Sequence, residues 1–126
     1  MSDNVDLITV KGLVKYFPVH TRGVLLRKQI GNVHAVDNIS FLIRKKETLS
    51  LVGESGCGKT TTARLILNLI EPTSGDIYFG TENIVTLFKS ADRSEKLRLR
   101  RKMQLIFQNP YGSLDPRMTV YDIISE

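Results

Sequence analysis

Hydrophobic and polar residues alternate along the first part of the chain, a pattern that predicts β-strands. Asp6–Val10 is the first such segment, and extended character resumes at 13–17 after an interruption at Gly12. Pro18 is expected to end this strand. The basic, glycine-punctuated residues 19–32 that follow predict either a hairpin or a flexible excursion.

A strand, a turn, a second strand and a helix are expected next. Residues 39–43 predict a strand whose apolar face consists of Ile39, Phe41 and Ile43. A turn at 44–47 leads to a short buried strand at 48–52. After a glycine-rich loop, apolar residues recur at the spacing of one helix face, namely Ala63, Ile66, Leu67 and Ile70. Pro72 is expected to end that helix.

The remaining pattern continues the mixture of strands and helices. It predicts a turn at 72–75, a strand at 76–80, and loop with some helix at 81–91. A charged helix end at 96–102 and a buried strand at 103–107 follow. After a loop at 108–117, the pattern predicts a last helix that contains Val120, Ile123 and Ile124 and is capped by Thr119. The basic run 98–102 has no interleaved aromatic residues, so we interpret it as a solvated face and expect no nucleic acid partner.

The loop between the strand at 48–52 and the following helix carries the most specific chemistry. Residues 53–60 match G-x-x-x-x-G-K-[ST], the Walker A phosphate-binding loop. Glycines let successive backbone N–H groups turn inward around an anion, and the helix adds the positive end of its dipole. The residues expected to bind the nucleotide are Gly53, Glu54, Ser55, Gly56, Cys57, Gly58, Lys59, Thr60 and Thr61.

Three side chains of this loop have distinct expected roles. Lys59 would reach the β- and γ-phosphates and is the catalytic candidate, the hydroxyl of Thr60 would ligate Mg²⁺, and Thr61 could donate to the α-phosphate. Cys57 occupies a variable position of the motif, and as the only cysteine it excludes an internal disulfide. The expected ligands are therefore ATP and Mg²⁺.

The bulk composition adds little to this reading. With 126 residues the chain is one domain or part of one, and a net charge of +5 weakly favours an anionic partner. No apolar run approaches the length of roughly 18 residues that a transmembrane helix needs. Charge and length therefore do not indicate the function, which has to be inferred from the motifs.

Further motifs resemble those of a known protein family. Tyr16 after the first strand, Glu71–Ile77 after the loop's helix and Met103–Pro110 together resemble the nucleotide-binding subunit of ABC transporters, with Gln108 at the Q-loop position. The branch that the chain resembles is that of oligopeptide and dipeptide importers. The segments that carry this closer resemblance are 15–19, 33–41, 51–59 and 110–118.

The resemblance implies an α/β fold, in which a RecA-like P-loop NTPase core is joined to a small antiparallel β subdomain. The implied division is 1–47 and 75–88 for the β subdomain, 48–72 and 103–117 for the P-loop core and Q-loop, and 118–126 for the start of a helical subdomain. It also implies that Tyr16 stacks on adenine and that Gln108 serves Mg²⁺ and the attacking water. His20 and His34 are taken as ordinary surface residues. The family usually has glycine where Lys46 stands, so that turn is strained if it needs positive φ.

The function implied is that of an ATPase subunit that couples ATP hydrolysis to peptide import at the cytoplasmic face of the inner membrane. Implied partners are a second ATPase subunit, permease subunits contacted through the Q-loop region and, indirectly, an extracytoplasmic solute-binding protein. The LSGGQ-type and Walker B motifs are absent from the sequence, so we expect this stretch to bind nucleotide and to be inactive by itself. Alternatives are a component of a soluble assembly such as phosphonate carbon–phosphorus lyase, or a non-catalytic nucleotide-binding fragment. A small GTPase or kinase explains Tyr16 and Gln108 less well.

Overall fold

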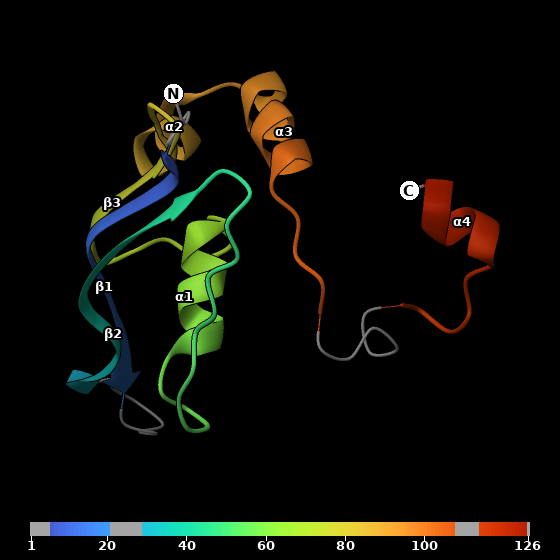
Figure 1. The fold of residues 1–126 in the computed structure, drawn as a ribbon. Coiled ribbons are helices and arrows are strands. Elements are labelled where there is room, and N and C mark those ends of the chain that lie inside the picture. The colour runs from blue at the N-terminus through green and yellow to red at the C-terminus, as the bar shows by residue number, and fades with distance from the viewer. Residues whose placement is uncertain (1–5, 21–28, 108–113, 126) are drawn as a thin grey trace.

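The structure is a computed structural model that describes residues 6–20, 29–107 and 114–125. Its centre is a four-stranded antiparallel sheet of strand order β2-β1-β3-β4 (Figure 1). The strands are β1 (Asp6–His20), β2 (Gln29–Arg44), β3 (Ser74–Phe79) and β4 (Glu82–Asn83). The helices are α1 (Lys59–Ile66), α2 (Ile84–Ser90), α3 (Arg93–Lys102) and α4 (Val120–Ser125). None of the described helices is long and apolar enough to cross a lipid bilayer.

Strand β1 is longer than the sequence predicts because neither Gly12 nor Pro18 ends it. Gly12 has φ +54° and lies at a register shift between Val10 and Leu13, where its N–H donates to Ser40 Oγ at 2.8 Å. Gly12 therefore bends the strand without breaking it. Pro18 pairs with Asn32 of β2 beyond the last residues of β1 that pair with β3. Proline is tolerated there because that side of the strand needs no N–H donor.

Strands β1 and β2 form a hairpin, one of the two alternatives predicted for residues 19–32, and they pair as far as His20 and Gln29. The prediction for 21–28 falls outside the described residues. The predicted turn at 44–47 is confirmed, with the Glu47 N–H donating to the Arg44 carbonyl at 3.2 Å. Lys46 has φ +64° in this turn, so the condition for strain at that position is met.

Helix α1 ends earlier than predicted, and Pro72 is not the cause. Asn68 has φ +49°, its N–H donates to the Leu65 carbonyl at 2.9 Å, and the Leu69 N–H donates to the Arg64 carbonyl at 2.9 Å. These two bonds form a Schellman motif with asparagine as the left-handed residue. The buried face of α1 also differs, because Thr62 and Leu65 are its buried residues. Ile66 and Ile70 of the predicted face pack partly buried against the core.

The other helices begin at side-chain caps. Asn83 Oδ1 accepts from the Thr86 N–H at 3.1 Å to cap α2, and Asp92 Oδ1 accepts from the Glu95 N–H at 2.9 Å to cap α3. The predicted cap of α4 is confirmed, since Thr119 Oγ1 accepts from the Asp122 N–H at 3.2 Å. The basic run of α3 remains on the surface, where Arg98 pairs with Glu82 at 2.9 Å.

One apolar core joins the sheet to three helices. Its buried members come from β1, β2, β3, α1, α2 and α3, and they are Ile8, Val10, Leu13, Val36, Ile77, Leu65, Ile84 and Leu99. Because Val36 and Leu65 belong to the same cluster, packing in this core holds α1 against β2. This contact positions the loop that precedes α1.

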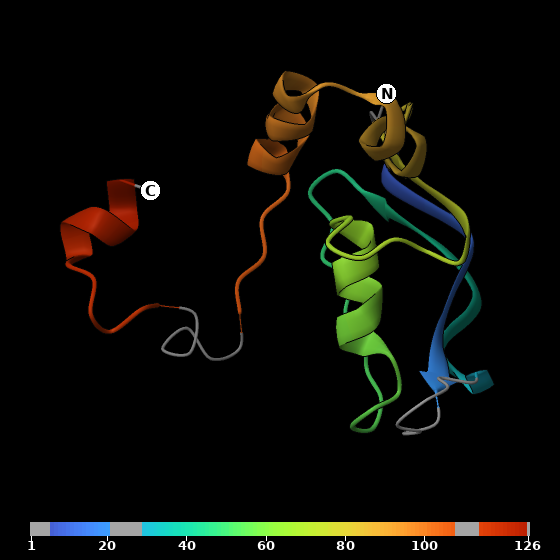
Figure 2. The ribbon, with the colours of Figure 1, turned by 180° about the vertical axis from the view of Figure 1, so that it is seen from behind.

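Two of the predicted strands, both in the described part of the chain, are not strands in the structure. Residues 48–52 are extended beside α1 in both views but belong to no sheet, and Val52 is 93% exposed (Figures 1 and 2). Residues 103–107 are likewise unpaired, with Ile106 95% exposed. A short apolar run predicts a buried strand only where a neighbouring strand supplies hydrogen bonds, and the one described sheet is completed by β1–β4.

Candidate phosphate-binding site

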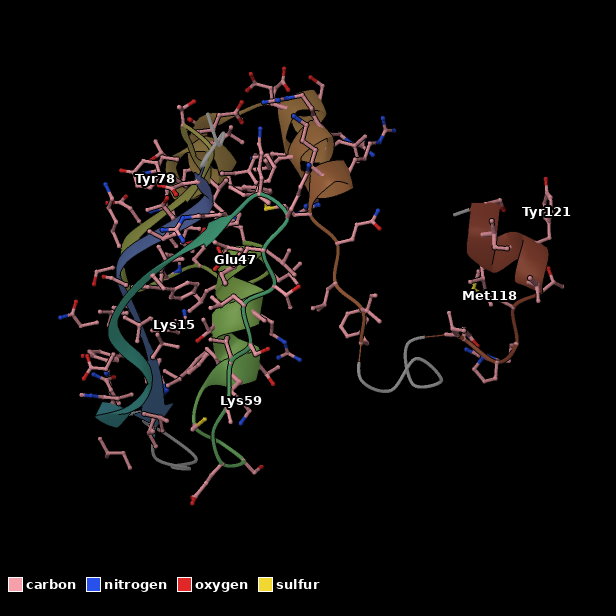
Figure 3. The ribbon with its side chains drawn as sticks, viewed as in Figure 1. Lys15, Glu47, Lys59, Tyr78, Met118 and Tyr121 are labelled. Atoms are coloured by element: carbon pink, nitrogen blue, oxygen red, sulfur yellow. The ribbon has the colours of Figure 1, made fainter. Side chains whose placement is uncertain are left out.

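The loop at 53–58 connects the extended segment to the N-terminus of α1. Figure 3 shows Lys59 at the first turn of α1 and Glu47 towards the opposite end of the helix, so the intervening chain runs along it. Gly56 and Gly58 have φ +84° and +96°, values that strongly favour glycine. The rim of the loop is exposed, including Gly53, Glu54, Ser55 and Gly56.

Both the backbone conformation at position 58 and the close contact there with β2 require a glycine. A Cβ atom at this position would lie 2.2 Å from the carbonyl oxygen of Ala35 in β2. At this point the backbone of the loop lies directly against the backbone of the hairpin. Only glycine allows it without a backbone shift.

The start of α1 presents backbone donors that have no acceptor within the helix. Gly58 at the N-cap has no side chain to accept a hydrogen bond, and the first turn contains no acidic residue. The first amide with an acceptor inside the helix is that of Thr62, which donates to the Gly58 carbonyl at 2.8 Å. The N–H groups of residues 59–61 precede it and have no such partner within the helix. Together with the helix dipole, they suit an anion such as phosphate.

Lys59 places its ammonium group within the loop. Its Nζ donates to the carbonyl oxygens of Gly53 at 2.8 Å and Glu54 at 2.6 Å, and it lies 3.4 Å from Cys57 Sγ. The ammonium therefore lies against the backbone of the loop that the motif assigns to phosphate binding. Cys57 is exposed, and its Sγ would be 2.6 Å from a Cβ atom added at Gly53.

The structure says less about the residues proposed to bind Mg²⁺ than about those of the phosphate loop. Thr60 is exposed and Thr61 is half-buried in the first turn of α1, whereas Gln108 lies outside the described residues. No cluster of three or more His, Cys, Asp and Glu side chains suited to a metal occurs in the described part of the chain. A nucleotide brings its own phosphate oxygens to Mg²⁺, so one threonine hydroxyl is a chemically adequate protein ligand.

Tyr16 lies outside the loop and pairs with a residue that sequence reasoning missed. Tyr16 and His34 are cross-strand partners whose rings stack with centroids 3.9 Å apart and planes 17° from parallel. The Tyr16 hydroxyl donates to Asp37 Oδ1 at 2.6 Å, and this bond, followed by burial and the charge of Asp37, raises the pKa of Tyr16 above 10.0. His34 Nδ1 is 3.9 Å from Asp37 Oδ2.

The hairpin and the loop line a common cavity of about 370 Å³ that is open to solvent. The residues that line it are His34, Ala35, Val36, Asp37, Ile39, Leu51, Val52, Cys57, Gly58, Lys59 and Thr62. The structure therefore brings the predicted Cys57, Gly58 and Lys59 together with His34 and Asp37. Tyr16 is not part of the lining and reaches the cavity through His34.

Comparison with known proteins identifies the family. The family model described as "ABC transporter" matches residues 36–125, which is most of the chain. The chain belongs to the ABC transporter family. The predicted fold class is confirmed, because the solved structure of MJ0796, described as "a Bacterial ABC Transporter Cassette", is similar at a TM-score of 0.67. That similarity covers 89% of this chain and 42% of the cassette, at 27% sequence identity.

Peptide transport proteins are among the curated relatives of this ABC family member. The oligopeptide transport ATP-binding protein OppF of Bacillus subtilis is 56% identical over 96 residues, covering 76% of this chain and 30% of the relative. The dipeptide transport ATP-binding protein DppF of Haemophilus influenzae is 40% identical over 126 residues, covering all of this chain and 36% of the relative. The chain spans about a third of the length of these relatives.

Proposed function

We propose that this chain is the nucleotide-binding part of an ABC importer ATPase that takes up oligopeptides or dipeptides. The observation that carries the proposal is the position of the Lys59 ammonium, 2.8 and 2.6 Å from the carbonyls of Gly53 and Glu54, in the loop that leads into the N-terminus of α1. A cation and oriented amides in one loop suit the phosphates of ATP. The names of the peptide-transport relatives support the class of solute.

Within this proposal each loop residue binds a different part of the nucleotide or its metal ion. Lys59 binds the terminal phosphates, Thr60 contributes its hydroxyl to Mg²⁺ and Thr61 donates to the α-phosphate. Tyr16 on β1 provides an aromatic ring for the adenine site, as the family resemblance implies. Gln108 is proposed to orient the attacking water and to contact Mg²⁺.

The proposed setting is peripheral, at the cytoplasmic face of a membrane. A second ATPase subunit and membrane-embedded permease subunits are the proposed partners, the latter contacted through the region that follows Phe107. Residues 48–72 and 103–117 are proposed as the P-loop core, and residues 1–47 and 75–88 as the β subdomain. Co-purification of the intact protein with a permease supports this setting, whereas co-purification with soluble lyase subunits contradicts it.

Lys59→Ala tests the nucleotide site directly. Removing the ammonium should raise the Kd for MgATP at least about tenfold, since a hydrogen bond to a charged group contributes roughly 1.5–3 kcal/mol. Lys45→Ala, in the exposed turn before the loop, is the matched control because it removes the same charge far from the phosphates. Equal MgATP affinity in the Lys59→Ala variant and in the parent protein would contradict the proposal.

A further inference from the structure

The aromatic pair on the hairpin adds a residue to the nucleotide site. We propose that His34 is a nucleobase-contacting residue, which forms with Tyr16 a two-ring platform and offers the imidazole on the cavity side of that platform. The proposal rests on the proposed function, because it requires a nucleotide whose phosphates bind the loop at 53–59. It places the base against the imidazole, with Tyr16 behind the imidazole as the second ring of the platform.

The first argument is the position of His34 relative to the phosphate loop. His34 immediately precedes Ala35, whose carbonyl oxygen makes the backbone contact with Gly58. His34 also lines the 370 Å³ cavity together with Cys57, Gly58 and Lys59, whereas Tyr16 does not. Of the two stacked rings, His34 is therefore the one that shares a cavity with the phosphate-binding residues.

The second argument is the way in which the pair is held. Asp37 accepts the Tyr16 hydroxyl at 2.6 Å through Oδ1, and its other oxygen is 3.9 Å from His34 Nδ1. One carboxylate thus faces both rings and favours their near-parallel arrangement at 3.9 Å. A preorganised flat surface lowers the entropic cost of stacking a third ring.

The third argument is exposure. The His34 side chain keeps 57% of its surface accessible even though Tyr16 covers one face of its ring. A ring whose only role was to stabilise the pairing of the two strands would contribute more free energy with both of its faces buried. A flat, half-covered ring beside a phosphate cradle suits a purine, because every base has a π-face.

The experiment compares two ligands in the intact protein, MgATP and magnesium tripolyphosphate. His34→Ala should weaken MgATP binding about tenfold, the scale of one lost base-stacking contact, and leave tripolyphosphate affinity unchanged. His34→Phe, which retains a flat ring, should restore most of the MgATP affinity. His20→Ala is the matched control, because His20 lies on the same hairpin but does not line the cavity.

The two ligands separate this inference from the proposed function. The inference is overturned if His34→Ala leaves MgATP binding unchanged, weakens both ligands equally as a structural role would, or tightens MgATP binding because the imidazole occupied the place of the base. The proposed function fails instead if the parent protein binds neither ligand. Retention of tripolyphosphate binding also shows that the His34→Ala variant is folded.

Discussion

Gly58 and Ala35 are in contact through their backbones, although they are far apart in the sequence. A Cβ atom on Gly58 would lie 2.2 Å from the Ala35 carbonyl oxygen, and φ at Gly58 is +96°. This contact joins the N-terminus of α1 to β2 at the residue that follows His34, so the phosphate loop meets the hairpin next to its aromatic pair. The packing of Val36 and Leu65 in the same core cluster reinforces it.

Gly58→Ala should therefore damage both stability and nucleotide binding. The left-handed conformation alone costs about 1–2 kcal/mol for a non-glycine residue, and the clash with Ala35 adds a backbone shift. We expect the free energy of unfolding to fall by at least about 2 kcal/mol in urea titrations, together with weaker MgATP binding. Gly56→Ala is the control, since Gly56 has φ +84° but no atom within 4 Å of an added Cβ. Equal losses of unfolding free energy in the two variants would contradict the contact argument.

Alkylation of Cys57 should block the phosphate site. Its exposed Sγ lies 3.4 Å from Lys59 Nζ and lines the cavity, so a maleimide adduct would occupy space that the phosphates need. We expect N-ethylmaleimide to abolish MgATP binding and prior addition of MgATP to slow the modification. Cys57→Ser removes the thiol and should bind MgATP with or without the reagent. Full MgATP affinity in the alkylated protein would show that the site lies elsewhere.

The Tyr16–Asp37 hydrogen bond should make stability depend on alkaline pH. The pKa of Tyr16 is raised in the folded state, first by this bond and then by burial and the charge of Asp37. A raised folded-state pKa means that the stabilisation is complete below about pH 10, the ordinary tyrosine value, and is lost as pH rises through the folded-state pKa. Asp37→Ala should lower the pKa of Tyr16, measured by tyrosinate absorbance, and flatten the alkaline loss of stability. Asp6→Ala at the start of β1 should leave both measurements unchanged.

Lys46→Gly should stabilise the protein. Lys46 has φ +64°, a conformation that costs a lysine about 1–2 kcal/mol, and the greater freedom of glycine in the unfolded chain offsets part of the gain. The expected net effect is an increase of about 0.5–1 kcal/mol in the free energy of unfolding, seen as a higher urea midpoint with unchanged slope. Lys45→Gly is the control, because φ at Lys45 is not positive and the substitution should destabilise the protein. Stabilisation by both variants would show that the gain does not come from φ at Lys46.

The sequence predicted the elements whose signals are local. The glycine loop, the helix after it and the cap of α4 at Thr119 all depend on residues within a few positions of one another. Backbone preferences and side-chain spacing act over that range, so they can be read without knowing the partners of an element. The same holds for the strain at Lys46, which follows from the turn that contains it.

Only the tertiary structure decided which distant residues meet. Residues 48–52 and 103–107 lie outside the one described sheet, because pairing and packing depend on neighbours that an apolar pattern does not specify. The end of α1 at Asn68 rather than Pro72 is a different case, since its two hydrogen bonds are local but apolar spacing does not reveal them. His34 was assigned no role, since its stacking on Tyr16 depends on the register of β1 against β2. A shift of one residue in that register would turn His34 to the opposite face of the sheet.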